Sequence, residues 1–207
     1  MPDLSHEIAA GLHDGTIICG VDEAGRGPLA GPVIAAAAIL PAEGLPADLA
    51  AQINDSKKLS AARREHLFVP LTRLCRYAVG EADVAEIDAM NILWASMLAM
   101  QRAVDRLPVK PDIALIDGNR CPHLACPARP IVKGDSISLS IAAASIIAKV
   151  MRDRLMTKLA VQYPFYGWDK NAGYGTTQHL AALRAHGATP WHRDSFAPVR
   201  ELLLSKD

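Results

Sequence analysis

The stretch GVDEAGRGPLAGPV, residues 20–33, constrains the fold more than any other part of the chain. An apolar run leads into two adjacent carboxylates, Asp22 and Glu23. The next positions include a glycine, an arginine and a glycine: Gly25, Arg26 and Gly27. Two acids at the end of a buried strand are unfavourable, through desolvation and repulsion, unless a cation neutralises them. Glycines permit close approach of a polyanionic backbone, and an arginine fork matches phosphate. The window therefore predicts a divalent metal and a phosphate ligand, rather than an acid pair facing water.

Length and charge limit the classes of protein to consider. The chain has 207 residues, enough for one substantial core with a short accessory segment. Lysine and arginine total 22, as do aspartate and glutamate, so the net charge is zero. A protein that holds nucleic acid by bulk charge is typically basic. Any contact with nucleic acid must therefore use a local basic patch.

The cysteines and the N-terminus predict a reducing, cytoplasmic location. The chain has four cysteines, and its first residues carry acids without a long apolar core, so no secretory signal is predicted. No apolar run is long enough to span a membrane. Cys121, His123 and Cys126 have no second ligand pair at suitable spacing, so a structural zinc site is not predicted.

The apolar pattern predicts a mixed α/β sheet flanked by helices. The expected strands are 16–22, 33–40, 76–80 and 112–117. The expected helices are one that Ser60 caps, one over 83–107, one over 137–163, one near 177–186, and a short one at the C-terminus. The Gly-Pro-rich turn between the first two strands indicates a hairpin. After Tyr163 the sequence becomes aromatic and glycine-rich, which indicates a C-terminal appendage on the core.

Three apolar segments end in acids, which the sequence places as candidate metal ligands. These acids are Asp22 with Glu23, Asp117 and Asp135. Ligands bind at strand ends in open α/β sheets, and carboxylates without histidine or cysteine suit Mg²⁺ or Mn²⁺. Two such ions about 4 Å apart activate a water and stabilise the leaving oxygen of a phosphodiester. Asp153 competes with Asp135 for the fourth position, but Lys149, Arg152 and Arg154 around it indicate a surface ion-pair network.

Asp22 and Glu23 present a geometric difficulty. Neighbouring strand residues point to opposite faces, so an ideal strand would not aim both at one ion. Either the Gly25–Gly27 turn distorts the strand end and brings them together, or one ligates while the other orients water or binds a second ion.

With these residues identified, the chain closely resembles bacterial ribonuclease HII from Ile17 to Val199. The motifs that carry the resemblance are GVDEAGRGPLAGPV, DSKKLS, IDAMNILWAS, LIDG, VKGDS, AAASIIAKVMRDR, GYGT..H and HRDSF.PV. The resemblance implies a ribonuclease H-like fold with a helical C-terminal segment. It implies a catalytic core over 1–163 and a substrate-binding segment over 164–207, packed together as one domain.

The resemblance also assigns roles to single residues. It implies that the family's metal-binding carboxylates are Asp22, Glu23, Asp117 and Asp135, with Mg²⁺ or Mn²⁺ as cofactor, and it favours Asp135 over Asp153. It implies that Gly25, Arg26 and Gly27 contact the backbone at a ribonucleotide and sense its 2′-hydroxyl. Tyr174 is similar to the tyrosine that packs on the sugar at an RNA-to-DNA junction. Without the motif, its aromatic neighbours would favour core packing instead.

Lys57 and Lys58 are the better candidates for phosphate contact because they lie in a family motif. Arg63, Arg64, Lys149 and Lys170 are further candidates, although each such residue is more often a solvated charge. His179 and His192 also lie in motifs, and we expect them to make structural hydrogen bonds.

The implied activity is endonucleolytic hydrolysis of RNA in RNA–DNA hybrids, with cutting on the 5′ side of single ribonucleotides in duplex DNA. The implied chemistry is two-metal-ion hydrolysis that leaves 5′-phosphate and 3′-hydroxyl ends, and the implied purpose is removal of ribonucleotides and RNA primers from DNA. A monomer suffices. Only about fifteen residues precede the first strand, which argues against the related HIII type, and the C-terminal residues lack a sliding-clamp peptide.

Two alternatives remain at this stage. A hybrid-binding module without catalysis would tolerate loss of the four carboxylates, and all four are present. A phosphatase for small molecules would need neither the glycine loop, Gly25–Gly27, nor Tyr174.

Overall fold

The computed structural model describes residues 1–205 and contains one five-stranded mixed sheet. The strands are β1 (Ile18–Ala24), β2 (Val33–Ile39), β3 (Arg76–Ala82), β4 (Ile113–Asp117) and β5 (Ala128–Ile131). Their order in the sheet is β3-β2-β1-β4-β5. β1, β2 and β3 pair antiparallel, whereas β1 with β4 and β4 with β5 pair parallel. The predicted hairpin and mixed sheet are therefore confirmed.

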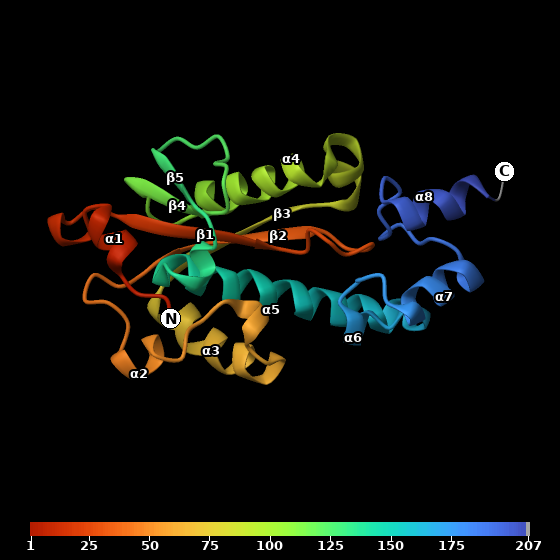
Figure 1. The fold of residues 1–207 in the computed structure, drawn as a ribbon, viewed down its shortest axis with the longest axis horizontal. Helices are drawn as coiled ribbons and strands as arrows, with labels where there is room; N and C mark the ends of the chain where they lie inside the picture. Colours follow the sequence, from red (N-terminus) through yellow and green to blue (C-terminus); the bar gives the residue numbers. More distant parts are fainter. Residues whose placement is uncertain (206–207) are drawn as a thin grey trace.

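Helices cover both faces of the sheet (Figure 1). The α-helices are α1 (Ser5–Ala9), α2 (Ala47–Ala50), α3 (Ala61–Leu74), α4 (Val84–Asp105), α5 (Leu139–Gln162), α6 (Trp168–Asn171), α7 (Thr177–His186) and α8 (Ala197–Leu204). Short 3₁₀ turns are η1 (Leu12–Asp14), η2 (Ser56–Lys58), η3 (Gly134–Ser136) and η4 (Pro164–Tyr166). In Figure 1, α4 lies on one side of the sheet, and α5 and α3 lie on the other. The side chains of Cys19 and Val21 pack in the α4 cluster, while Ala36 and Ala38 pack in the α5 cluster.

Local sequence signals account for the helix starts. The Ser60 side chain accepts a hydrogen bond from the Arg63 amide, as predicted for the cap of α3. Asp83 and Glu86 form a capping box at the start of α4. One feature differs from the predicted helix over 83–107. Its helical geometry breaks at Asn91, where φ is 68°, and the Asn91 side chain accepts from the Leu93 amide to restart the helix.

The first strand runs two residues further than predicted. We expected it to end at Asp22, but β1 continues to Ala24 because β2 pairs with it as far as Ala24 opposite Ile34. Asp22 and Glu23 are therefore strand residues with alternating orientation, rather than residues of a distorted turn.

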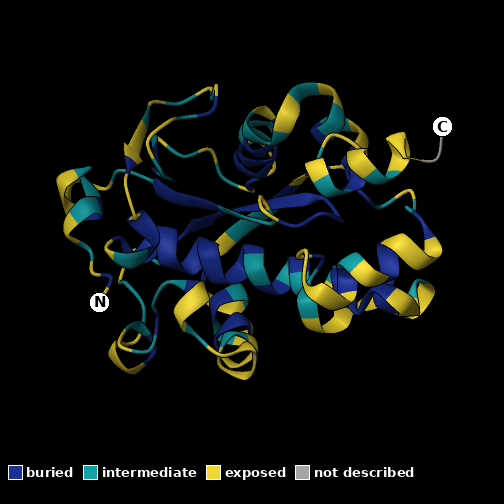
Figure 2. Cartoon of the chain, turned by 45° about the vertical axis from the view of Figure 1, so that its right-hand side comes forward, coloured by how far each residue is buried: buried dark blue, intermediate teal, exposed yellow. Residues whose placement is uncertain are grey.

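The segment after residue 163 packs on the far end of α5. Tyr166 and Trp168 are buried against Met156 and Leu159 of α5. Leu29, Leu183 and Val199 form a second apolar cluster that joins the β1–β2 connection to α7 and α8. In Figure 2 the two central strands β1 and β2 and the first half of α5 are mostly buried, and exposed residues lie on the outer helix surfaces. Among the described residues, none of the helices has the length and apolarity needed to cross a membrane.

Candidate active site

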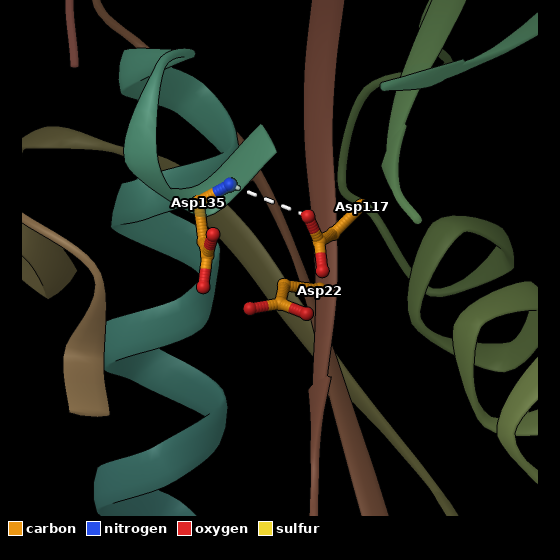
Figure 3. A group of neighbouring side chains, drawn as sticks. All are labelled: Asp22, Asp117 and Asp135. Atoms are coloured by element: carbon orange, nitrogen blue, oxygen red, sulfur yellow. Dashed lines mark hydrogen bonds between the residues drawn. The ribbon is translucent and has the colours of Figure 1, made fainter. Parts of the chain in front are cut away.

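Three of the predicted carboxylates meet at one end of the sheet (Figure 3). Asp22 of β1, Asp117 at the end of β4 and Asp135 of η3 each offer an oxygen, and these oxygens lie within 4.8 Å of one another. The Asp135 amide donates to Asp117 Oδ1 at 3.3 Å. Asp22 and Asp135 are buried. The structure thus joins acids separated by more than 110 positions in the sequence.

The sheet and one glycine explain this convergence. Val21 lies opposite Ile116 in the parallel pair of β1 and β4, so Asp22 and Asp117 follow side by side. η3 follows shortly after β5 and lies at the same end of the sheet. A Cβ at Gly134 would lie 2.6 Å from Ile141 Cδ1 and 3.3 Å from Asp117 Oδ1, so a larger residue would displace the Ile141 side chain and crowd the Asp117 carboxylate.

The cluster raises the pKa of all three carboxyl groups. Burial raises the pKa of Asp22 well above 3.8, and the charges of Glu23 and Asp117 add to that effect. Burial is also the main cause of the raised pKa of Asp117, and burial followed by the charge of Asp117 raises that of Asp135. Hard oxygen donors that repel one another in this way suit a divalent cation, which would replace the missing positive charge. The donor set therefore fits Mg²⁺ or Mn²⁺.

Glu23 is not part of the three-carboxylate group. Its Oε1 accepts a hydrogen bond from Arg26 Nη1 at 3.2 Å. Its Oε2 is buried and has no hydrogen-bond partner among the described residues. Its charge still reaches the cluster, because it raises the pKa of both Asp22 and Asp117. Because Glu23 lies outside the group that Asp22 joins, the first of the two predicted geometries, in which both adjacent acids face one ion, is not observed.

Asp153 lies in an ion-pair network, as predicted, but of the three cations named from the sequence only Lys149 pairs with it, because Arg154 pairs with Glu65 and Arg152 is buried. Its Oδ1 accepts from Lys149 Nζ at 2.6 Å, and its Oδ2 accepts from Arg64 Nη2 at 3.3 Å. It is not a member of the acidic group that contains Asp135.

Lys57 and Lys58 lie beside the cluster on η2. Lys57 Nζ is 3.9 Å from Asp135 Oδ2, and Lys58 Nζ donates to Ser136 Oγ at 3.3 Å. Partial burial lowers the pKa of Lys57, but the charges of the surrounding aspartates outweigh it and raise the pKa overall. The Ser145 hydroxyl of α5 donates to Ser56 Oγ at 2.7 Å, which fixes η2 against α5. Lys57 therefore remains charged next to the carboxylates.

The glycine loop and Tyr174 lie against each other. A Cβ on Gly27 would lie 3.3 Å from Tyr174 Cε1, so a side chain there would require the ring to shift by a few tenths of an ångström. Gly25 has φ of +101°, and a Cβ there would collide with the Arg152 side chain. Tyr174 is 48% exposed, so the alternative of core packing is wrong for this residue. Its ring forms a surface next to Arg26 and Gly27, both of which are exposed.

His179 and His192 make the structural hydrogen bonds that we expected. Trp168 Nε1 donates to His179 Nε2 at 3.1 Å, and His192 Nε2 lies 3.0 Å from the same nitrogen. His192 Nδ1 accepts from the Thr189 amide at 2.9 Å. This network is satisfied when both rings are neutral, with His192 Nε2 and His179 Nδ1 as donors. His179 then donates to the Tyr174 carbonyl, 2.9 Å away, and holds that segment in place.

Arg152 and Arg193 are the residues near the site that sequence reasoning missed. Both side chains are buried, and both donate to backbone carbonyls around the glycine loop. A signal for Arg152 was present in the sequence. It lies four residues after Ala148 and four before Met156, on the buried side of α5, where a solvated arginine would not be expected. Arg193 had no comparable periodic pattern.

Comparisons with known proteins agree with this geometry. The sequence model of the Ribonuclease HII family matches residues 19–199. The chain is 58% identical to Ribonuclease HII of Granulibacter bethesdensis over 208 residues, covering 100% of this chain and 93% of that one. Ribonuclease H2 from Pyrococcus horikoshii has a similar structure, with a TM-score of 0.74, 27% identity, and coverage of 91% and 97% of the two chains. Bst-RNase HIII in complex with Mn²⁺ shares the fold at a TM-score of 0.73 and 21% identity, over 94% of this chain and 72% of that one.

The mixed sheet between helices, with three carboxylates gathered at one end of it, defines a nuclease of the ribonuclease H class. The match over 19–199 and the identity to bacterial relatives make the assignment specific: the chain belongs to the Ribonuclease HII family. It is thus a ribonuclease H enzyme that acts on RNA–DNA hybrids.

Proposed function

We propose that this enzyme also cuts duplex DNA on the 5′ side of a single embedded ribonucleotide, in addition to the RNA strand of hybrids. The observation that carries the proposal is the contact between the glycine loop and the exposed Tyr174 ring. A long hybrid offers a 2′-hydroxyl at every step, whereas a single ribonucleotide requires one group that detects it and another that accepts the following deoxyribose. The loop and Tyr174 are adjacent candidates for these two tasks.

Asp22, Asp117 and Asp135 would hold divalent cations, with Glu23 beside them. When bound, Mg²⁺ or Mn²⁺, as a pair, would activate water for in-line attack and stabilise the leaving oxygen, which gives 5′-phosphate and 3′-hydroxyl ends. The raised pKa values and the buried, unpartnered Glu23 Oε2 support this assignment. The Mn²⁺ complex of Bst-RNase HIII supports the choice of ion.

Basic side chains of the protein would hold the phosphate backbone of the nucleic acid. Lys57, 3.9 Å from Asp135, keeps its charge at the cluster and would attract the phosphate to be cut. Lys58 and Arg26 present exposed charge on either side and would contact neighbouring phosphates. This local patch is consistent with a chain whose net charge is zero.

The sugar would be read by Gly25, Arg26, Gly27 and Tyr174. The backbone amides of a glycine loop reach a 2′-hydroxyl that a larger side chain would block. A flat tyrosine ring against the next sugar would reject a 2′-hydroxyl there by steric fit and desolvation. We assign the core to residues 1–163 and duplex binding to 164–207, and we propose that the enzyme acts as a monomer.

The primary test is cleavage of a labelled DNA duplex that contains one ribonucleotide. The assay includes Mg²⁺, Mn²⁺ or chelator, an all-DNA duplex and the Asp22→Asn variant. We expect a metal-dependent nick 5′ to the ribonucleotide that the variant does not produce. An intact duplex under both metals, with hybrid cleavage retained, would contradict the proposal.

A second variant tests the sugar assignment. Tyr174→Ala should lower the rate on the single-ribonucleotide duplex by about tenfold or more, since loss of stacking against one nucleotide is worth about 1–3 kcal/mol. Phe165→Ala is the matched control, because Phe165 is also an exposed aromatic residue of this segment but stacks on His186. Equal losses in the two variants would count against a specific role for Tyr174.

A further inference from the structure

Two buried arginines lie beneath the glycine loop without a carboxylate partner. Arg152 is 1% exposed and Arg193 is 0% exposed. Neither forms an ion pair with any of the residues 1–205, although Arg193 also packs its guanidinium 5.0 Å from the centre of the Phe196 ring. Buried cations are normally paired with anions, because desolvation strongly disfavours an unpaired charge.

Backbone carbonyls solvate both guanidinium groups. Arg193 donates to the carbonyls of Gly25 (2.6 Å), Arg26 (3.0 Å), Pro28 (2.8 Å) and Gly31 (2.7 and 2.9 Å). Arg152 donates to the carbonyls of Ala30 (2.9 Å), Pro32 (3.0 Å) and Ala172 (2.9 Å). Almost every acceptor belongs to the connection between β1 and β2.

This arrangement is unfavourable for the charged groups themselves. Burial lowers the pKa of Arg193 to about 9, and the neighbouring charge of Arg152 contributes. Burial likewise lowers the pKa of Arg152 to about 10. A well-packed apolar residue at either position would avoid this desolvation but would leave several loop carbonyls without donors, so the two arginines serve the conformation of this loop.

The carbonyl contacts fix the direction of two peptide units. In a planar trans peptide the carbonyl and the N–H point in opposite directions. Arg193 draws the carbonyls of Gly25 and Arg26 inward, and the N–H groups of those same peptides belong to Arg26 and Gly27. These two N–H groups therefore point away from Arg193. No acceptor among residues 1–205 is bonded to either, and both residues are exposed.

We infer that Arg193, supported by Arg152, is a positioning residue that aims the Arg26 and Gly27 amides at the substrate and thereby sets selectivity for a ribonucleotide. This inference rests on the function proposed above. A cation bonded to a carbonyl also polarises the peptide, which makes its N–H a stronger donor. The substrate group recognised would be an acceptor, a sugar 2′-hydroxyl next to a phosphate oxygen.

The same arginines set the distance between the loop and Tyr174. Arg152 joins the loop to the Ala172 carbonyl, two residues before Tyr174. The Leu29 amide donates to the Gly173 carbonyl at 2.8 Å, and the Arg193 amide donates to the Leu29 carbonyl at 2.9 Å. Both sugar-contacting elements are thus fixed to one frame.

The test compares affinities for two duplexes that differ by one oxygen atom. Fluorescence anisotropy in Ca²⁺ gives the Kd for a duplex with one ribonucleotide and for the all-DNA duplex, with gels to verify that neither is cut. In Arg193→Lys the charge remains but the fork that binds several carbonyls is lost. The quantity compared is the Kd for the all-DNA duplex divided by the Kd for the duplex with one ribonucleotide. We expect this ratio to fall by about tenfold relative to wild type, which is the effect of losing one well-placed hydrogen bond. Arg152→Lys should show a smaller fall in the same direction.

Arg102→Lys is the matched control, because Arg102 also donates to a carbonyl but lies on α4 and pairs with Glu86. Its ratio should equal that of wild type. A folded Arg193→Lys protein with an unchanged ratio would overturn the inference, since a purely structural role weakens both affinities equally. A wild-type ratio near one would instead refute the proposed function.

Reduced stability of the variant does not prevent the test. Hydrogen exchange and ¹⁵N chemical shifts of the Arg26 and Gly27 amides report loop geometry directly, below the melting temperature. We expect both signals to change in Arg193→Lys and to stay in place in Arg102→Lys. Unchanged amide signals in a folded Arg193→Lys protein would also overturn the inference.

Discussion

At the scale of single residues, the acidic cluster opposes the stability of the metal-free protein. The pKa of Asp22 is raised above 3.8, chiefly by burial, so the folded state holds its proton more tightly than the unfolded state. Unfolding free energy therefore falls as the pH rises from about 4 through that raised pKa. Asp117 and Asp135 act in the same direction, and a bound cation would reverse the effect.

Asp22→Asn should stabilise the metal-free protein at neutral pH, because it removes one buried charge from the cluster. The variant should also lose the rise in melting temperature that Mn²⁺ gives the wild type, and lose activity by about 100-fold or more. Thermal unfolding with and without Mn²⁺ checks both stability effects. Asp14→Asn is the control, since Asp14 is exposed and outside the cluster. A variant that is less stable without metal than the wild type would contradict this account.

At the scale of elements, α5 lies directly on β1 and connects the separate parts of the site. Gly20 permits this contact, because a Cβ there would collide with the Ser140 and Ile141 backbone. The same helix carries Ser145 next to η2 and Arg152 beneath the glycine loop. The spacing between β1 and α5 thus determines how Asp22 faces Asp135.

Gly20→Ala should destabilise the protein by about 3 kcal/mol, since neither backbone can move away without disturbing the core. Gly44→Ala is a useful comparison. Gly44 has φ of +80° and open space around it, so alanine there meets only the left-handed conformational penalty of about 1 kcal/mol. Urea unfolding of the two variants measures the difference. Equal losses of unfolding free energy would show that the β1–α5 contact accommodates an added methyl group.

The histidine pair makes the C-terminal segment sensitive to acid. Burial, with the neighbouring His179, lowers the pKa of His192 from 6.5 to about 4. The unfolded state then binds more protons than the folded state between these values, so stability is full above pH 6.5 and is lost as the pH falls toward 4. We expect the unfolding free energy to drop by about 2 kcal/mol from this residue between pH 7 and pH 5. Denaturant unfolding at both pH values should show a smaller drop in His192→Asn, and an unchanged drop in His13→Asn, where the histidine is exposed.

At the scale of the whole molecule, the C-terminal segment and the core share apolar clusters. Met156 and Leu159 of α5 are covered by Tyr166 and Trp168, and Leu29 packs with Leu183 and Val199. We therefore expect one cooperative unfolding transition, with a calorimetric enthalpy equal to the van't Hoff enthalpy. A chain cut after residue 163 would expose this surface and should lack a sharp transition. Two separate transitions in the full chain would contradict the single-domain assignment.

Much of the fold and site was predictable because it depends on local chemistry. Apolar runs predicted the buried strands, the Gly-Pro-rich turn predicted the hairpin, and Ser60 predicted the start of α3. Asp22, Asp117 and Asp135 stood out because acids beside apolar strands need a reason to be there. The chain's membership of the Ribonuclease HII family also followed from motifs that lie within the sequence itself.

Only the tertiary structure decided the extent of β1 and the burial of Tyr174 and Arg193, because these depend on contacts with residues distant in the sequence. The pairing partner in β2 extended β1 to Ala24, and the group of three carboxylates forms without Glu23. The open surface next to Gly27 decided that Tyr174 is exposed rather than part of the core. The carbonyls of a loop more than 160 residues away decided that Arg193 is buried. A sequence specifies which side chains are apolar or charged, but the burial and the partner of a charge are set by non-local contacts.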